Sequence, residues 1–195
     1  QKRKILRSVF WVFVLEKIMS KGLNLSGKKI IAALSSFWFR YASEGRVIIA
    51  VSGGVDSMVL LEGLLRLVKD AQSRRRFLVA HVNHALRGKE SDEDEALVGA
   101  YARKQGVDVR SLRIDWESHR PTQALCREKR DAFFLSLCEG SKDTIWLAHH
   151  LNDQAETVFL RLLRGSGARG LRGMLPKNGR KLRPFLDLEK TELIS

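Results

Sequence analysis

The stretch that most constrains the fold is residues 47–58, which read V-I-I-A-V-S-G-G-V-D-S-M. A run of β-branched and apolar residues at 47–51 stops at the S-G-G string. An apolar sequence with helical spacing then starts at Ser57. This order predicts a strand, a glycine turn and a helix.

The glycine turn has the chemistry of an anion cradle. Gly53 and Gly54 let an oxyanion approach the backbone without meeting a Cβ, and Ser52 and Ser57 add hydroxyl donors. The following helix adds unpaired N–H groups and the positive end of its dipole. Asp56 would repel a phosphate unless a hard cation lay between them, so we expect it to be an Mg²⁺ ligand. The alternative is a tight turn in which Asp56 or Ser57 only caps the helix.

The string S-G-G-V-D-S directly after an apolar strand resembles the pyrophosphate-binding loop of the N-type ATP pyrophosphatases. Those enzymes cleave ATP to AMP and pyrophosphate. The phosphate loop of kinases and GTPases, G-x-x-x-x-G-K followed by Ser or Thr, does not occur in the sequence. The resemblance implies ATP as the bound nucleotide. It implies nucleotide-binding roles for Ser52, Gly53, Gly54, Val55, Asp56 and Ser57.

The charge balance indicates a polyanionic partner. The chain has 195 residues, and 35 Lys plus Arg against 22 Asp plus Glu give a net charge of +13. Nucleic acid is the leading candidate for such a partner. Cys126 and Cys138 lie twelve residues apart and form no C-x-x-C, which argues against a disulfide framework, a zinc site or an iron–sulfur site. A reducing, cytoplasmic location fits this cysteine usage.

The first 45 residues are predicted to form a helical extension, followed by one catalytic domain over 46–195. Residues 2–7 are basic and 9–15 are apolar, a pattern also seen in targeting segments, so organelle targeting stays open. Seven apolar residues are far fewer than the roughly 20 that a membrane span needs, so no membrane association is expected. A later segment has an apolar face at helical spacing, formed by Ile30, Ala33, Leu34, Phe37, Trp38 and Tyr41.

The rest of the chain alternates strand and helix patterns. Such alternation predicts an α/β fold with a doubly wound, mainly parallel sheet flanked by helices. The expected strands are 77–83, 109–114, 144–148 and a short one at 182–186. The expected helices are 57–68, 91–105 and three that begin near residues 121, 153 and 189.

Polar side chains follow several of these strands. Parallel strands bind ligands at their carboxyl ends, so residues just after a strand are candidates for the site. Asp56 and Asp153 each follow a strand, and we expect them to face one crevice and to share the Mg²⁺. The helix from Asp153 carries Asp153, Glu156 and Thr157 on a polar side. An apolar face of Ala155, Val158, Phe159, Leu162 and Leu163 lies opposite.

Four strings occur in a telling order: S-G-G-V-D-S at 52–57, H-V-N-H-A-L-R at 81–87, A-H-H-L-N-D-Q-A-E-T at 148–157 and R-G-S-G-A-R-G-L-R-G-M at 164–174. With R-P-F-L at 183–186, they resemble the tRNA(Ile)-lysidine synthetase family over about residues 45–195. The first string is shared across the pyrophosphatase superfamily, whereas the others point to the lysidine enzymes.

The resemblance implies a two-step reaction. ATP adenylates the carbon-2 carbonyl oxygen of the wobble cytidine in the isoleucine tRNA with a CAU anticodon, and pyrophosphate leaves. The amino group of free lysine then displaces AMP, which gives lysidine. ATP and Mg²⁺ are the implied cofactors, and tRNA(Ile) and L-lysine are the implied partners.

The resemblance also implies residue roles. Asp56 and Asp153 would hold the metal, and Arg127 would contact a phosphate or developing negative charge. His149 and Glu156 would orient lysine or accept a proton from its ammonium. The alternative for Glu156 is an ordinary acid in the first turn of a helix. Nucleotide contacts are implied for His81, Asn83, His84 and Arg87.

Three residues depart from the family pattern: Asn152, Asp131 and Lys190 stand where an acid, a tyrosine and an arginine are usual. The family usually has further C-terminal domains, so the chain is expected to be a C-terminally incomplete catalytic domain. One alternative is another superfamily enzyme, such as a tRNA thiolase or an amidotransferase synthetase; the missing C-x-x-C weighs against the usual thiolase. The other is a truncated module that binds ATP and tRNA without catalysis. The sequence leaves the oligomeric state open.

Overall fold

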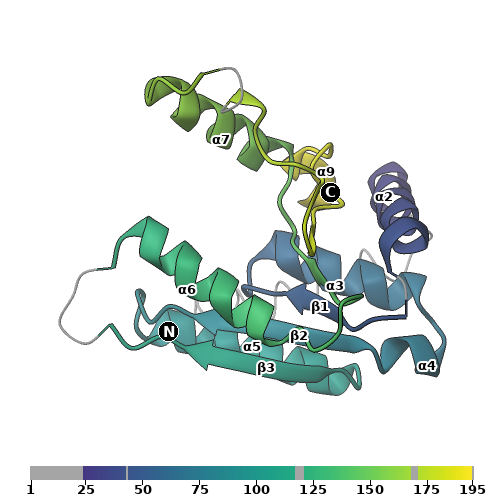
Figure 1. Ribbon diagram of the computed structural model, residues 1–195. Helices are drawn as coiled ribbons and strands as arrows, with labels where there is room; N and C mark the ends of the chain where they lie inside the picture. Colours follow the sequence, from purple (N-terminus) through teal and green to yellow (C-terminus); the bar gives the residue numbers. More distant parts are fainter. Residues whose placement is uncertain (1–23, 43, 117–120, 168–170, 195) are drawn as a thin grey trace.

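A computed structural model describes residues 24–42, 44–116, 121–167 and 171–194. Its centre is a six-stranded sheet in the order β3-β2-β1-β4-β6-β5 (Figure 1). All neighbouring strands are parallel except β5 and β6, which pair antiparallel. The strands are β1 Val47–Ala50, β2 Phe77–Asn83, β3 Asp108–Arg113, β4 Thr144–Trp146, β5 Lys177–Asn178 and β6 Lys181–Leu182.

Helices flank this sheet, so the predicted α/β fold with a doubly wound, mainly parallel sheet is confirmed. The chain runs from β1 outward through β2 and β3, then returns to the other side of β1 with β4. The helices are α2 Leu25–Tyr41, α3 Val55–Leu67, α4 Ala71–Arg74, α5 Lys89–Lys104, α6 Gln123–Ser136, α7 Leu151–Leu163 and α9 Lys190–Ile194.

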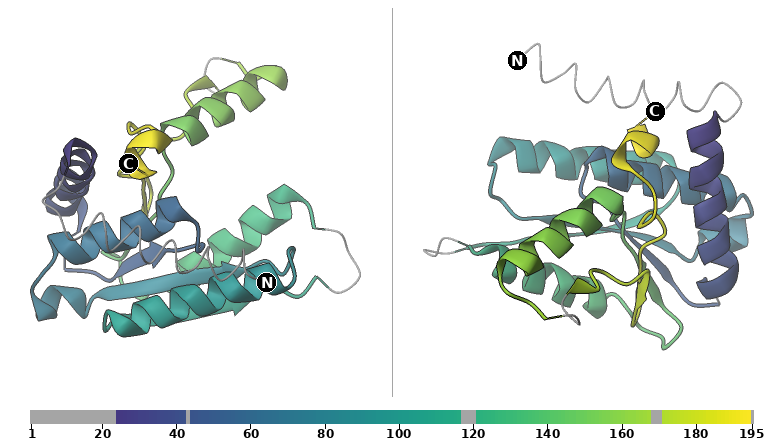
Figure 2. Two further views of the ribbon diagram at one scale, coloured as in Figure 1. Left: turned by 180° about the vertical axis from the view of Figure 1, so that it is seen from behind. Right: turned by 90° about the horizontal axis from the view of Figure 1, so that it is seen from above.

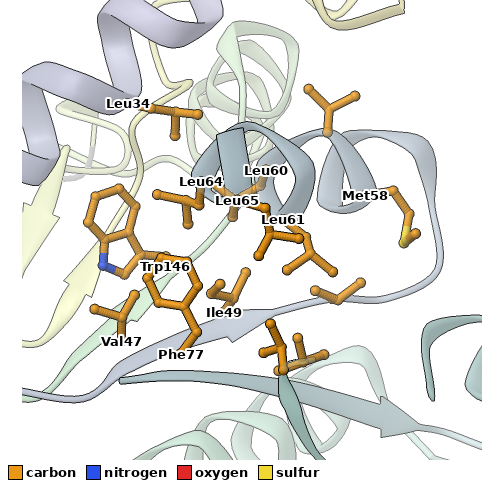
Figure 3. Packing of buried hydrophobic residues seen from close by; sticks show 14 of the residues in the cluster. Leu34, Val47, Ile49, Met58, Leu60, Leu61, Leu64, Leu65, Phe77 and Trp146 are labelled. Carbon is orange, nitrogen blue, oxygen red and sulfur yellow. The ribbon is translucent and has the colours of Figure 1, made fainter. Parts of the chain in front are cut away.

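The core has two parts, one on each face of the sheet. Side chains of a strand alternate between the faces, so Val47 and Ile49 of β1 join one cluster and Ile48 joins the other. The larger cluster contains α3 residues and Val98 of α5, and Figure 3 shows α3 leucines over β1. Phe134 of α6 belongs to the smaller cluster. Each face of the sheet is therefore covered by helices.

Helix α2 is part of this core. Its N-cap Asn24 accepts a hydrogen bond from the backbone N of Gly27 at 2.8 Å. Leu34 is fully buried in the larger cluster, and α2 lies beside α3 (Figure 2). A Cβ at Gly63 of α3 would lie only 2.4 Å from Leu34 Cδ1, so the absence of a side chain there allows the close approach. Residues 1–23 lie outside the described residues, so the division at residue 45 stays a prediction.

Several predicted element boundaries differ from the structure, and two of the differences affect the region of the site. The helix expected from Asp153 begins at Leu151, because His150 caps it and Asp153 lies within its first turn. The strand expected at 182–186 is only the two-residue β6, and it pairs with β5, which was not predicted. Residues that follow it leave the sheet and form a turn, in which Leu186 N donates to Arg183 O.

Helix α7 leaves its apolar face exposed. The apolar face was read correctly from the sequence, but Phe159, Leu162 and Leu163 are 59%, 57% and 67% exposed. No described residue of α7 is buried, and Figure 1 shows the helix standing apart from the sheet. Within the described ranges, no helix has both the length and the apolar character needed to cross a membrane.

We predict that Leu34→Ala lowers the free energy of unfolding by about 2–5 kcal/mol. Leu34 is 0% exposed, and the substitution leaves a cavity between α2 and α3. Urea unfolding followed by circular dichroism measures the change. Phe39→Ala on the same helix is the matched control, since Phe39 is 84% exposed. Equal losses in both variants would contradict the packing of α2 described above.

Candidate active site

A cavity of 260 Å³ lies at the carboxyl ends of β1, β2 and β4. Strands β2 and β4 lie on opposite sides of β1, so the order in which the chain adds strands to the sheet reverses at β1. Doubly wound folds bind ligands at the carboxyl ends of the strands beside such a reversal. Its wall combines the glycine loop, strand ends and one helix. The lining residues are Ala50, Val51, Ser52, Gly54, Asp56, Ser57, Val82, His84, Arg130, Phe134, Leu147, Ala148 and His149.

The glycine loop is held by its two serines. Ser57 Oγ donates to Gly54 O at 2.8 Å and accepts from Ser52 N at 3.1 Å. Helix α3 begins after Gly54 without a side-chain cap, and its first backbone bond runs from Met58 N to Gly54 O. The N–H groups of its first turn therefore remain available to an anion.

Asp56 lies at the mouth of this loop. Its Oδ1 is buried and has no hydrogen-bond partner among the residues that the structure describes. Its Oδ2 lies 3.6 Å from His150 Nε2 and 3.8 Å from Lys190 Nζ. A buried carboxylate oxygen without a partner fits a cation that approaches from the cavity, because desolvation of an unpaired charge is costly. The observation agrees with the predicted Mg²⁺ role of Asp56, which stays a prediction.

His150 connects the two predicted metal ligands. It is buried, and its Nδ1 accepts from Asp153 N at 3.4 Å while its own N donates to Asp153 Oδ2 at 2.9 Å. These two bonds form a capping box at the start of α7. His150 was not among the predicted site residues, although a polar residue three positions before an acid at a helix start was a usable signal.

Asp153 is therefore linked to Asp56 through His150, and the expectation that the two acids share a metal stays a prediction. Glu156 is exposed on the next turn of α7. Over the described part of the chain, no group of three or more His, Cys, Asp or Glu side chains is arranged to hold a metal by itself. Mg²⁺ usually keeps several waters and takes only one or two carboxylates plus substrate phosphates, so a pair of carboxylates is compatible with the predicted metal site, which stays a prediction.

His149 lines the cavity and contacts Arg183, which sequence reasoning had placed only within a motif. Arg183 Nε donates to His149 Nδ1 at 3.3 Å, and Arg183 Nη1 donates to Leu175 O at 2.8 Å. Burial and, after it, the charges of Arg183, Arg130 and Arg127 together lower the pKa of His149 to about 4, against the opposing effect of Asp153. His149 is thus neutral near pH 7.

Helix α6 supplies the basic side of the site. Arg130 lines the cavity, and its buried Nε has no hydrogen-bond partner in the described chain. Arg127 is exposed one turn earlier, near enough to affect His149 electrostatically. Both guanidinium groups are suited to phosphate oxygens. Arg130 and Phe134 were missed as lining residues because only the fold places α6 over this strand end.

The residues of the string H-V-N-H-A-L-R at 81–87 do not all face the cavity. His84 lines the cavity, and its ring stacks on Trp116. His81 does not line it: His81 is buried, and its Nδ1 lies 2.8 Å from Val51 O. Asn83 faces α5, where its Nδ2 donates to Asp92 Oδ1 and Glu95 Oε2 at 3.0 and 2.8 Å. Alternate residues of a strand face opposite sides of the sheet, so His81 and Asn83 support the strand end rather than contact a ligand in this cavity.

Arg87 is tied to the glycine loop indirectly. It pairs with Asp94 at 2.8 Å, and Asp94 packs under Gly53. The three departures from the family pattern also have partners. Asn152 Oδ1 accepts from Lys190 N at 2.9 Å. Asp131 Oδ2 accepts from Lys181 Nζ at 2.7 Å, and Lys181 and Arg130 hold the pKa of Asp131 below its usual value although burial raises it.

Comparison with known proteins agrees with this geometry. A family described as the PP-loop domain matches residues 26–195. The chain belongs to the PP-loop family. The glycine loop at the carboxyl edge of a parallel sheet is therefore a PP-loop, and the predicted pyrophosphatase-type loop is confirmed at the level of the family.

Several curated relatives of this PP-loop chain are named tRNA(Ile)-lysidine synthase. The tRNA(Ile)-lysidine synthase of Exiguobacterium sibiricum is 39% identical over 153 residues, which are 75% of this chain and 34% of the relative. The protein of that name from Geobacter sulfurreducens is 41% identical over 159 residues, 76% of this chain and 32% of the relative. The chain thus spans about a third of the length of these relatives.

Solved structures share the fold at low identity. The U34-tRNA thiolase NcsA from Methanococcus maripaludis superposes with a TM-score of 0.61 at 17% identity, over 87% of this chain and 61% of the thiolase. The FMN adenylyltransferase of Candida glabrata, in complex with FAD and inorganic pyrophosphate, gives 0.54 at 11% identity over 95% of this chain and 63% of the other. Both comparisons support the fold assignment alone.

We predict that Gly53→Ala destabilises the protein by more than about 1 kcal/mol. Gly53 has φ +87°, and a Cβ there would lie 2.9 Å from Asp94 Cβ. Gly54→Ala is the matched control, since Gly54 has φ −73° and its Cβ would make ordinary contact with Ser52 Oγ at 3.4 Å. Thermal unfolding of the two variants measures the difference, and equal melting temperatures would contradict it.

We also predict a pH dependence of stability that originates at His149. The folded-state pKa is about 4 and the ordinary pKa is 6.5, so the unfolded state binds the extra proton between these values. The stabilising contribution of neutral His149 is therefore present above about pH 6.5 and is lost as the pH falls toward 4. Unfolding in urea at several pH values should give a smaller acid loss for His149→Gln than for the wild type. Parallel curves would show that His149 titrates normally.

Proposed function

We propose that this chain is the catalytic PP-loop part of a tRNA(Ile)-lysidine synthase. The observation that carries the proposal is the 36–41% identity to curated proteins of that name over about three quarters of this chain. The substrates are ATP, free L-lysine and the isoleucine tRNA with a CAU anticodon. The net charge of +13 supports an RNA partner.

ATP occupies the cavity at the carboxyl edge of the sheet. Its phosphates lie on the PP-loop, where the uncapped first turn of α3 offers N–H groups. The adenine base contacts the apolar part of the wall, which Val82, Phe134 and Leu147 form. This orientation is supported by where the lining residues lie. Polar side chains line the cavity at the loop, and the three apolar side chains come from β2, from α6 and from the segment after β4.

Asp56 and Asp153 hold Mg²⁺, which when bound neutralises negative charge on the phosphates. The chain itself prepares this site in two ways. The buried Asp56 Oδ1 has no partner within the described residues, and the capping box fixes Asp153 relative to His150. Lys190 places its Nζ 3.8 Å from Asp56 Oδ2. Asn152 positions Lys190 beside this carboxylate, because its Oδ1 accepts a hydrogen bond from the backbone N of Lys190.

The reaction has two bond exchanges. The carbon-2 oxygen of the cytidine attacks the α-phosphorus of ATP and pyrophosphate leaves; the lysine amino nitrogen then bonds to carbon 2, and AMP leaves with the oxygen. Arg127 and Arg130 balance the negative charge of the phosphates. The lysine ammonium must lose a proton before it attacks, and Glu156 on α7 is exposed and available for that transfer.

Pyrophosphate release tests the proposal. The chain is incubated with ATP and Mg²⁺, with and without lysine and the CAU-anticodon tRNA. We expect release that depends on the tRNA, together with radiolabelled lysine that becomes attached to it. An isoleucine tRNA with a GAU anticodon is the matched control and should support neither. Binding of tRNA without any ATP turnover would contradict catalysis by this chain and favour a binding module.

We predict that Asp56→Asn lowers the rate of pyrophosphate release at least about 100-fold without unfolding the protein. The substitution keeps the shape of the side chain and removes its charge beside the PP-loop. Asp108→Asn is the control, since Asp108 is exposed at the first residue of β3, at the opposite end of the strands. A folded Asp56→Asn protein with near-normal release would remove Asp56 from the metal site.

A further inference from the structure

Arg183 is unusual among the arginines of the site because it is buried. Only 8% of the residue is exposed, directly after β6. Its Nη1 donates to Leu175 O at 2.8 Å, and its backbone N donates to Pro176 O at 2.8 Å. The remaining contact is from Nε to His149 Nδ1, at 3.3 Å. The guanidinium is therefore fixed by the preceding segment and directed at one imidazole nitrogen.

This contact determines where His149 carries its proton. A guanidinium has only donors and keeps its charge in proteins, so it cannot accept a hydrogen bond from Nδ1. His149 Nδ1 must therefore be the unprotonated acceptor, and the proton of the neutral ring lies on Nε2. Since His149 lines the cavity, Nε2 is the ring nitrogen left for a bound ligand.

We propose that Arg183 is a positioning residue that holds His149 in the Nε2–H form, as a hydrogen-bond donor to an oxygen atom of the bound nucleotide. The identity of that ligand rests on the proposed function. The contact between Arg183 and His149 is observed in the structure and does not depend on the proposed function. With Nδ1 engaged and Nε2 protonated, His149 has no lone pair for a proton from lysine, so that transfer falls to a carboxylate such as Glu156.

The surrounding charges act in the same direction. Besides burial, the cations that face His149 are Arg183, Arg130 and Arg127, and all three oppose a positive charge on the ring. Among the described residues, the carboxylate of Asp153 opposes these cations and raises the pKa of His149, but its effect is smaller than that of Arg183. A second protonation, which would break the bond to Arg183, is thereby disfavoured at neutral pH.

His81 provides an internal contrast. Its Nδ1 lies 2.8 Å from the carbonyl oxygen of Val51, which can only accept. His81 must therefore carry its proton on Nδ1, the opposite arrangement from His149. The imidazole rings of His81 and His149 thus serve as references for each other in a single NMR spectrum.

The test is nitrogen-15 NMR of the imidazole rings, because ring nitrogen shifts separate protonated from unprotonated nitrogens. The labelled 195-residue chain is measured near neutral pH without ligand, and His149→Gln assigns the signals. We expect His149 with an unprotonated Nδ1 and His81 with a protonated Nδ1. A protonated His149 Nδ1 in the wild type would overturn the proposal, and this readout needs no folded variant of Arg183.

Arg183→Gln then tests the cause. An amide can donate or accept, so it releases the constraint, and we expect the Nδ1–H form of His149 to appear and its pKa to rise toward the ordinary value. His81 should keep its pattern. Arg180→Gln is the matched control, because Arg180 contacts Gly140 O at the other end of β6. An unchanged His149 in folded Arg183→Gln would overturn the role of Arg183.

Turnover distinguishes this proposal from the proposed function. If the wild type releases pyrophosphate, Arg183→Gln should lower kcat by about 10- to 100-fold and change the KM for ATP much less. Equal kcat in the two proteins would overturn a role in the reaction. If the wild type shows no turnover, the proposed function fails, while the NMR result still decides whether Arg183 fixes the His149 tautomer.

Discussion

The whole structure depends on the double pairing of β1. This four-residue strand is hydrogen-bonded in parallel to β2 on one side and to β4 on the other, and Val47, Ile48 and Ile49 are fully buried. Both clusters of the core meet there, one on each face. The PP-loop follows this strand directly, so a buried strand that is paired on both sides fixes the position of the loop.

Charge is segregated around the cavity. The carboxylates of Asp56 and Asp153 lie where β1 and β4 end, with His150 between them. The guanidinium groups of Arg130 and Arg183 lie on the other side, toward α6 and β6. A triphosphate with its cation needs both kinds of group, and on the carboxylate side Lys190 is the cation beside Asp56.

Much of this was predictable from sequence because local patterns determine it. The apolar run, the S-G-G break and the helical spacing after Ser57 define β1, the loop and α3 without long-range information. Asp56 follows from the same local reasoning. His150 was missed, because neighbouring residues usually point apart, and only the backbone path after β4 brings both His149 and His150 to the site. Position in the second motif likewise could not separate His84 from His81, whose rings fall on opposite faces.

Other residues depend on tertiary contacts that no local pattern contains. Arg183 follows a two-residue strand, and its partner His149 lies 34 positions earlier in the chain. The apolar face of α7 was read correctly, yet periodicity carries no information about what covers a face, and Phe159 is exposed. The need for a glycine at position 63 is visible only in the folded structure, where Leu34 of α2 packs against it.

The pairing of β1 with β4 also has a kinetic meaning. Val47 faces Thr144, and the backbone N of Arg46 beside it bonds to Asp143 across 97 residues of chain. Contacts of such high sequence separation carry a large loop-closure entropy and form slowly. Leu147, Ala148 and His149 reach the cavity only after β4 has joined the sheet. A folding intermediate that contains β1, β2 and β3 alone therefore has the PP-loop but lacks the part of the wall that follows β4. Nucleotide affinity should arise late in folding, together with the completed sheet.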